Sequence, residues 1–510
     1  MPLLSLSARF VVRLAFVGAA AALLPAVLPA AEPAKRPNVL FFAVDDLRTD
    51  LGCYGHPEAK TPHIDALARR GMVFRRAYCQ QAVCSPSRTS LLTGLRPDST
   101  KVYDLVTHFR DTVPDVVSLP QHFREQGYYT VGMGKIYHGG YDDPKSWSEP
   151  HRNGTGEGYV LPENKARMAA GKAREKAAKN SKNKKKKAAG GAARGEPYEM
   201  ADVPDEAYHD GSLAQMAIDK LRELKGKPQP FFLAVGFLKP HLPFNSPKKY
   251  WDLYDPAQLK LAANPFRPKD APPYAVTDFG ELRNYHGVPQ SGPISDEMAR
   301  KLIHSYRAAS SFTDANVGKV LAELDQLGLT DNTIVVLWGD HGWKLGEHAS
   351  WCKHSNMEND TNAPLILAAP GIKTAAPAGG FPATTALVEF VDIYPTLCEL
   401  AGLPLPPHLQ GVSLKPLLEN PARPWKSAAF SQYPRSHEGT PLMGYALRTD
   451  RYRYVEWRHR QTGAPVNYEL YDHATDPAEN QNIAGRPENA ELLQQLAAQL
   501  KAGWEAARPR

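Results

Sequence analysis

Four largely apolar runs in this chain each end in charged or imidazole side chains, and this pattern constrains the fold more than any other feature. The runs span residues 37–44, 128–134, 231–237 and 332–338. Uninterrupted apolar runs of this length are typical of parallel strands that are buried on both faces. Because ligands bind at the carboxyl ends of strands in open parallel sheets, the pattern predicts an α/β fold with a polar site at one edge of the sheet.

The side chains that follow these runs are the candidates for that site. They form the pairs Asp45 and Asp46, Lys135 and His138, Lys239 and His241, and Asp340 and His341. Adjacent buried carboxylates are unfavourable unless a positive charge lies between them, so the paired aspartates indicate a positive group nearby. Each pair alone could be a polar turn, a solvated lysine or a structural histidine. Four such pairs at one edge favour a shared functional site.

A short stretch from Cys84 to Gly94 is the second constraining feature. It reads Cys-Ser-Pro-Ser-Arg-Thr-Ser-Leu-Leu-Thr-Gly. Ser85 can cap a helix, Pro86 suits its first turn, and Gly94 suits its end. A cysteine at a helix N-terminus lies where exposed N–H groups and the helix dipole favour an anion, and Arg88 adds a cation one turn later. From these residues alone, a small buried thiol remains the alternative.

This stretch resembles the signature of the type I sulfatases, Cys-x-Pro-Ser-Arg followed after four residues by Thr-Gly, at every fixed position. In that family a dedicated enzyme oxidises the cysteine to formylglycine. One oxygen of the hydrated aldehyde attacks sulfur, and loss of the second proton then expels sulfate. The resemblance implies that Cys84 is the precursor of this nucleophile. It also implies a maturation partner, either a formylglycine-generating enzyme or an anaerobic sulfatase-maturing enzyme.

The resemblance also implies a metal site and a set of catalytic side chains. The implied metal ligands are Asp45, Asp46, Cys84, Asp340 and His341. Three carboxylates suit a hard divalent cation, Ca²⁺ or Mg²⁺, although a histidine is less typical of a calcium site. The implied catalytic residues are Cys84, Arg88, Lys135, His138, His241 and Lys353.

The roles of these side chains follow from the same resemblance. Arg88, Lys135 and Lys353 would stabilise the charge of the transferring group in a preorganised site. His138 would orient the diol or assist its breakdown. His241 would protonate the departing alkoxide, and Lys353 competes with it for that role.

Further motifs narrow the resemblance to the branch that contains iduronate-2-sulfatase and its bacterial relatives. Gly134–His138 matches a Gly-Lys-x-x-His segment of sulfatases, and Phe237–Phe244 is similar to the corresponding stretch of this branch. Many sulfatases have Asp-Asn where this chain and that branch have Asp-His, at residues 340–341. The implied activity is hydrolysis of O-sulfate on a carbohydrate such as a glycosaminoglycan or an algal polysaccharide. The sugar itself stays open, because the loops that contact it are the least constrained part of the chain.

Two other functions fit parts of this pattern. One is a phosphonate or phosphate ester hydrolase of the same superfamily, some members of which share formylglycine. The other is a catalytically dead homologue that binds carbohydrate, which the intact charged set from Asp45 to Lys353 disfavours. A panel of substrates distinguishes the first alternative, and ordered calcium without turnover would indicate the second.

The resemblance implies an alkaline-phosphatase-like large domain over residues 32–424, with a mixed, mostly parallel sheet between helices. A smaller C-terminal α+β subdomain with an antiparallel sheet is expected over residues 425–510, because four strand-like pieces lie there. Apolar spacing predicts a helix over residues 387–403. Residues 255–295 are rich in Pro, Gly and polar groups, and we expect them to form a long loop over the site.

The formal net charge of +7 comes from one segment. Residues 165–194 contain twelve Lys or Arg and one Glu, so the rest of the chain carries a net charge of −4. The run Lys184–Lys187 lies among Ala, Gly and Asn, a composition that predicts a solvated, disordered insertion over residues 160–196. A tether for a polyanion is the alternative. No aromatic residues alternate with these cations, which disfavours nucleic acid as a partner.

Residues 1–31 have the pattern of a secretory signal peptide. Arg9 and Arg13 form a basic start, Val11–Leu28 is almost wholly apolar, and small residues follow. A membrane anchor is the alternative, and no later run is long enough to span a bilayer. We therefore expect a secreted or periplasmic protein without a transmembrane segment after removal of the signal.

Overall fold

The computed structural model describes residues 36–179, 194–372, 376–377 and 379–509. The expected signal peptide and the run Lys184–Lys187 lie outside the described residues, so both stay predictions, as does the boundary at residue 424. None of the helices that the structure describes combines the length and the hydropathy that a membrane crossing requires.

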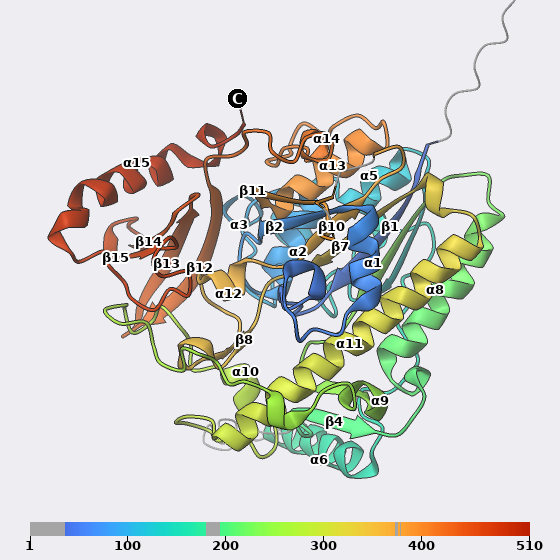
Figure 1. The fold of residues 1–510 in the computed structure, drawn as a ribbon, viewed down its shortest axis with the longest axis horizontal. Helices are drawn as coiled ribbons and strands as arrows, with labels where there is room; N and C mark the ends of the chain where they lie inside the picture. The colour runs from blue at the N-terminus through green and yellow to red at the C-terminus, as the bar shows by residue number, and fades with distance from the viewer. Residues whose placement is uncertain (1–35, 180–193, 373–375, 378, 510) are drawn as a thin grey trace, which may run out of the picture. The chain divides into compact units, whose positions relative to one another are not determined.

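A seven-stranded sheet carries the four polar-ended runs (Figure 1). Its strands, in spatial order, are β11 (Ala383–Glu389), β2 (Met72–Tyr78), β10 (Leu365–Ala368), β7 (Thr333–Gly339), β1 (Asn38–Val44), β5 (Phe231–Phe237) and β3 (Tyr129–Gly134). Every neighbouring pair is parallel except the two that include β10. The polar-ended runs are β7, β1, β5 and β3, side by side and in one direction. The prediction of a mixed, mostly parallel sheet is confirmed.

Strand β1 shows why both faces of this sheet need a cover. Its side chains alternate, so that Leu40 and Phe42 belong to one apolar cluster and Val39 and Phe41 to the other. All four are fully buried. Burial of each such side chain contributes about 1.5–3 kcal/mol, which makes a helical layer on each face strongly favourable.

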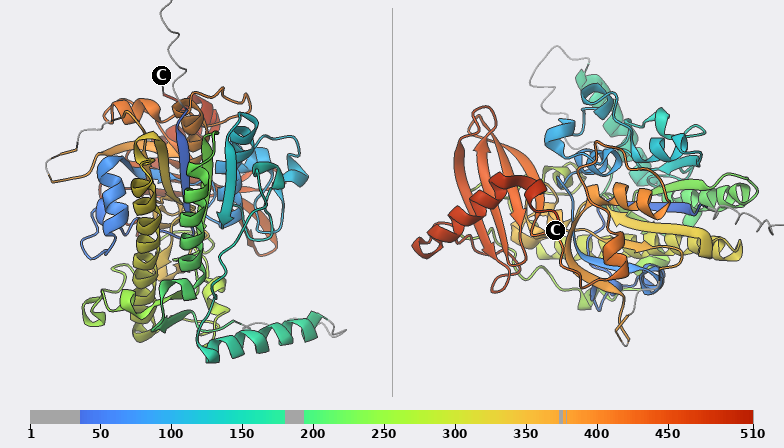
Figure 2. Two further views of the ribbon diagram at one scale, coloured as in Figure 1. Left: turned by 90° about the vertical axis from the view of Figure 1, so that its right-hand side faces the viewer. Right: turned by 90° about the horizontal axis from the view of Figure 1, so that it is seen from above.

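Helices on each face supply these two layers. On the Leu40 face lie α1 (Pro62–Arg70), α8 (His209–Lys225) and α11 (Asp296–Gln326). Figure 2 shows α8 and α11 running side by side. On the Val39 face lie α2 (Cys84–Thr93), α5 (Leu119–Glu125) and α13 (Ile393–Leu400).

A second sheet of four antiparallel strands forms the C-terminal region, as predicted. The strands are β12 (Ala429–His437), β13 (Thr440–Arg448), β14 (Tyr452–His459) and β15 (Pro465–Asp472), paired in sequence order. Helix α15 (Ala490–Ala506) packs on this sheet through an apolar cluster that includes Leu447, Tyr454 and Leu496. The C-terminal sheet also contacts the segment before α2, because Ser431 donates a hydrogen bond to the carbonyl of Cys79.

The helix predicted over residues 387–403 is wrong at its start. Residues 387–389 end strand β11, where they pair with β2, and α13 begins only at Ile393. The buried carboxylate of Glu389 accepts hydrogen bonds from the side chains of Arg96 and Lys426. Because these partners are distant in sequence, apolar spacing could not reveal that the strand continues to Glu389.

The prediction of disorder over residues 160–196 is wrong for the part that the structure describes. Residues Pro162–Lys179 form helix α6, which is rich in Ala, Lys and Arg, all strong helix formers. The start of α6 is held by the buried carboxylate of Glu199, on β4 (Tyr198–Ala201). It accepts hydrogen bonds from the backbone N–H groups of Val160 and Leu161. Composition alone gave no sign of this anchor.

Candidate active site

The carboxyl ends of β1 and β7 bring the predicted acidic residues together. Val44 pairs with Gly339, so the next residues on the two strands, Asp45 and Asp340, are neighbours. The backbone N–H of Asp46 donates to the Asp340 carboxylate over 3.0 Å, and the hydroxyl of Tyr306 donates to the Asp46 carbonyl over 2.7 Å. The three aspartates are fully buried, which fixes their carboxylates in one place.

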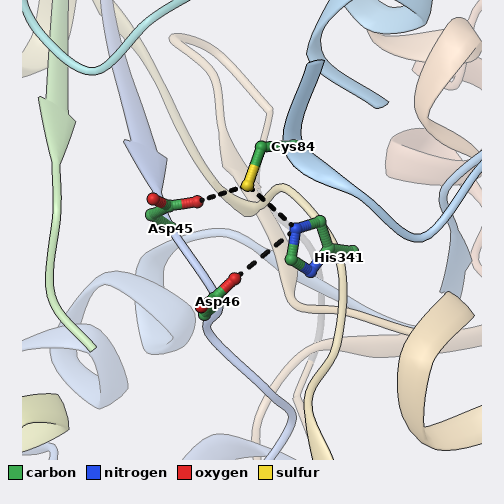
Figure 3. Close-up of side chains that lie close together, drawn as sticks. All are labelled: Asp45, Asp46, Cys84 and His341. Atoms are coloured by element: carbon green, nitrogen blue, oxygen red, sulfur yellow. Dashed lines mark hydrogen bonds and ion pairs between the residues drawn. The ribbon is translucent and has the colours of Figure 1, made fainter. Parts of the chain in front are cut away.

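Cys84 reaches the same point from the N-terminus of α2 (Figure 3). Its sulfur lies 3.4 Å from Oδ1 of Asp45 and 3.4 Å from Nε2 of His341. Nε2 of His341 also lies 3.5 Å from Oδ1 of Asp46. These four side chains offer ligand atoms that all lie within 4.8 Å of one another, so the structure groups them as a candidate metal centre.

The fifth predicted ligand, Asp340, lies at the edge of this group. Its Oδ2 is 3.5 Å from Nε2 of His341 and accepts a hydrogen bond from Nε of Arg88 over 2.9 Å. Arg88 also contacts Oδ1 of Asp45 at 3.4 Å and donates to the carbonyl of Ile136. The guanidinium is fully buried and its donors are occupied, so Arg88 holds the two carboxylates in position.

Two lysines complete the charged centre. Nζ of Lys135 forms an ion pair with Asp45 and lies 3.6 Å from the sulfur of Cys84. Nζ of Lys353 lies 3.0 Å from Oδ1 of Asp46 and 4.7 Å from the ring centre of Trp343. The structure therefore places a cation beside each aspartate of the Asp45-Asp46 pair.

The two adjacent carboxyls nevertheless differ in their pKa. Burial raises both, but for Asp45 the charge of Lys135 and its neighbours outweighs burial and holds the pKa well below its usual range. For Asp46, Lys353 does not outweigh burial and the adjacent Asp45 charge, so the pKa is raised. A further positive charge among these carboxylates would relieve this strain. Three buried carboxylates and an imidazole fit a divalent cation with a preference for oxygen ligands.

Burial also acts on the thiol of Cys84. It raises the pKa of this group well above the ordinary value, and the Asp45 charge adds to the effect. A thiol with a raised pKa is a poor nucleophile at neutral pH, because the thiolate is the reactive form.

His241 and an unpredicted residue, Glu281, close the centre on one side. Nε2 of His241 lies 3.0 Å from Oε1 of Glu281 and 3.8 Å from Oδ2 of Asp46. Nζ of Lys353 lies 2.9 Å from Oε2 of Glu281. Glu281 belongs to α10 (Gly280–Arg283), inside the loop expected to lie over the site. A single acidic residue in an irregular, Pro-rich loop carries no periodic signal, so the sequence did not single it out.

Lys239, which ends the same strand as His241, is not part of the charged centre. Its Nζ donates to the carbonyls of His241 and Pro243, over 2.9 and 2.6 Å. Burial lowers its pKa to about 8. Lys239 therefore shapes the turn that presents His241.

His138 lies beside Lys135 rather than against Cys84. It lines a cavity of about 520 Å³ together with Lys135, His151 and His209. Burial and the Lys135 charge lower its pKa to about 4, so its imidazole is neutral at neutral pH. Among the described residues, its Nδ1 is buried and has no hydrogen-bond partner.

Known proteins resemble this chain over the region that contains the charged centre. A family model described as Sulfatase matches residues 37–403, and one described as N-sulphoglucosamine sulphohydrolase, C-terminal, matches residues 346–505. The chain is 36% identical to iduronate 2-sulfatase of Mus musculus, over 90% of this chain and 93% of that protein. It is 30% identical to a sulfatase of Formosa agariphila, over 92% and 88%.

A solved structure shares the fold. The phosphonate monoester hydrolase of Agrobacterium radiobacter aligns with a TM-score of 0.70 at 24% identity, over 92% of this chain and 96% of that chain. The region matched by the first family model includes every residue of the charged centre, from Asp45 to Lys353.

Proposed function

Since this chain belongs to the sulfatase family and is a sulfuric ester hydrolase, we propose that its substrate is an O-sulfate ester of a carbohydrate, such as a glycosaminoglycan or an algal polysaccharide. The name of the mouse relative, iduronate 2-sulfatase, supports a sulfated uronate as the first class to test. One observation carries the proposal most directly. The Cys84 sulfur lies 3.4 Å from a carboxylate and an imidazole and 3.6 Å from an ammonium, at a helix N-terminus.

We assign the nucleophile to residue 84. Once oxidised to formylglycine, this residue supplies a hydrated aldehyde whose oxygen attacks sulfur. Lys135 lies next to that position and keeps positive charge where the negative sulfate oxygens approach. Arg88 acts through Asp45 and Asp340, whose carboxylates it holds in place.

The acidic residues are assigned to a cation. Asp45, Asp46, Asp340 and His341 would hold Ca²⁺ or Mg²⁺, which supplies positive charge to polarise the sulfate. The imidazole of His341 is oriented for this role, because its Nδ1 lies 3.0 Å from the carbonyl of Gly342 and leaves Nε2 facing the carboxylates.

The proton for the leaving alcohol is assigned to His241. Its Nδ1 lies 2.6 Å from the carbonyl of Leu242, so this nitrogen carries the hydrogen and Nε2 is the atom that exchanges a proton with the substrate. Lys353, whose Nζ shares a carboxylate with His241, is the second candidate for this step. His138, neutral at neutral pH, would orient the diol or assist its breakdown.

The proposal also includes export of the chain and enzymatic conversion of Cys84. A signal peptide over residues 1–31 would direct the chain to the periplasm or the outside of the cell. A formylglycine-generating enzyme, or an anaerobic sulfatase-maturing enzyme, would convert Cys84. The fold shared with a phosphonate monoester hydrolase keeps a phosphorus ester as the second candidate substrate class.

The first experiment is mass spectrometry of the tryptic peptide over residues 77–88, from protein made together with a maturing enzyme. A mass loss that matches thiol-to-aldehyde conversion is expected at residue 84, with Cys79 in the same peptide as an unconverted internal control. The converted protein is then assayed on sulfated glycosaminoglycan fragments and algal polysaccharides, with phosphonate and phosphate esters as competitors. Turnover by protein whose residue 84 is an unmodified thiol would overturn the mechanism, and ordered calcium without any turnover would favour a binding protein.

A further inference from the structure

Glu281 is the one acidic residue of the centre that the mechanism above does not use. Its backbone is well supported, because Phe279, just before α10, and Leu282 of α10 belong to an apolar cluster that also contains Trp343 and Trp351. These four side chains are buried. The backbone that carries this carboxylate therefore cannot shift without disrupting that cluster.

The carboxylate of Glu281 pairs with both candidates for protonating the leaving alcohol, His241 and Lys353. Oε1 lies 3.0 Å from Nε2 of His241, and Oε2 lies 2.9 Å from Nζ of Lys353. These cationic neighbours hold the pKa of Glu281 well below its usual range against the effect of burial. An anion that reaches His241 and Lys353 therefore comes within a few ångströms of a fixed negative charge.

The cost of that approach depends on the charge of the substrate. Coulomb repulsion scales with the product of the charges, and it is strong in a buried site of low effective dielectric constant. A sulfate ester carries one negative charge at every physiological pH. A phosphate monoester carries nearly two above its second pKa of about 6, so Glu281 repels it about twice as strongly.

Without Glu281, the other groups of the centre would favour the opposite order. Arg88, Lys135, Lys353 and a divalent cation attract a dianion more strongly than a monoanion. Resting on the proposed function, we propose that Glu281 determines specificity: it disfavours doubly charged phosphate monoesters and so selects singly charged sulfate esters. Specificity of this kind arises from repulsion of the wrong substrate rather than from a new contact with the right one.

The test compares Glu281→Gln, which removes the charge and keeps the shape, with Glu281→Asp, which keeps the charge. The probes are 4-nitrophenyl sulfate and 4-nitrophenyl phosphate at pH 8. We expect Glu281→Gln to raise the phosphate-to-sulfate ratio of kcat/KM at least tenfold, and Glu281→Asp to stay within threefold of the wild type. Glu297→Gln, an exposed change on α11, is the matched control and should leave the ratio unchanged.

A second readout keeps the test independent of turnover. Dissociation constants of both esters are measured by calorimetry on protein whose Cys84 is unconverted, because this protein cannot consume them. The same tenfold change in the binding ratio is expected for Glu281→Gln. An unchanged ratio in both measurements, in a variant that unfolds at the wild-type temperature, overturns the assignment. If wild-type protein hydrolyses no sulfate ester, the proposed function fails, while the binding ratio still decides the role of Glu281.

Discussion

Two of the groups of acids and histidine that the described residues form look alike by composition but differ in their electrostatics. One is the centre of Asp45, Asp46, Cys84 and His341. The other joins Glu358, His473 and Glu479, between α12 (Glu358–Thr361) and the C-terminal sheet. In both clusters the potential ligand atoms lie within 4.8 Å of one another.

In the second cluster, arginine and histidine side chains already balance the charge of the two carboxylates. Nε of Arg453 lies 2.5 Å from Oε1 of Glu479, and the same guanidinium pairs with Glu358. Nε2 of His473 lies 2.9 Å from Glu479, and its Nδ1 accepts from Arg448. Burial opposes ionisation, but Arg453 outweighs it and lowers the pKa of both glutamates.

The first cluster leaves one carboxyl with a raised pKa. Each aspartate of the Asp45-Asp46 pair has one lysine, yet the two carboxylates repel each other and Asp46 is not fully stabilised as an anion. The comparison teaches that proximity of acids and histidine does not by itself indicate a metal site. The informative feature is the negative charge that guanidinium and ammonium partners leave unbalanced.

The largest expected effect is loss of activity when the cysteine of the first cluster is replaced. Cys84→Ala should lower kcat/KM on a sulfate ester by at least about 10³-fold, because removal of a covalent nucleophile leaves only binding and electrostatic stabilisation. Its thermal unfolding should resemble that of unconverted wild-type protein. Steady-state kinetics and calorimetry check both parts, and a variant that keeps more than a tenth of the activity would place the nucleophile elsewhere.

The opposite result is expected in the second cluster. Glu479→Gln removes one of the two carboxylates that pair with the buried Arg453 and leaves only Glu358 to balance that charge, so the free energy of unfolding should fall by about 3 kcal/mol. Activity per folded molecule should not change. Urea denaturation measures the loss. Arg451→Gln, which breaks a pair with Asp472 in which the arginine side chain is 55% exposed, should cost less than about 1 kcal/mol. Equal losses in the two variants would contradict the comparison.

Divalent cations should act on only one cluster. At a free concentration of about 100 times the dissociation constant, Ca²⁺ should stabilise the wild type by about 2.7 kcal/mol, and a chelator should remove this gain. The gain should disappear in Asp46→Asn and persist in Glu479→Gln, as unfolding scans with and without added CaCl₂ would show. If the calcium effect is instead lost in Glu479→Gln and kept in Asp46→Asn, the ion binds at the second cluster and the comparison is wrong.

Acid should weaken the second cluster by a smaller amount. The pKa values of Glu358 and Glu479 are lower in the folded than in the unfolded state, where they lie near 4.3, so the unfolded state binds more protons as the pH falls below about 5. Their stabilisation is therefore present at neutral pH and lost toward pH 2. The fall in unfolding free energy between about pH 6 and pH 3 should be shallower in Glu479→Gln, which has one such group fewer. A steeper fall in the variant would reverse the sign of this argument.

The sequence predicted the sheet edge well, because apolar runs report burial and parallel topology brings their ends together. Asp45, Lys135, His241 and Asp340 therefore lie where the pattern placed them. Glu281 and the Arg453 network could not be predicted, since their partners are brought close only by tertiary packing. The same reason explains the error at Glu389, where distant cations stabilise a strand that apolar spacing assigns to a helix.

Because β1 lies in the middle of the sheet, it must wait during synthesis for a partner strand that comes much later in the chain. This first strand pairs on one side with β7, whose residues follow about 300 positions later. At 5–20 residues per second, a ribosome needs roughly 15–60 s to cover that distance. During this interval β1 lacks one neighbour, and residue 84 is not yet enclosed by His341 and its flanking segment. The conversion of Cys84 that we propose would therefore have a window of seconds, which closes when β7 docks and the sheet is complete.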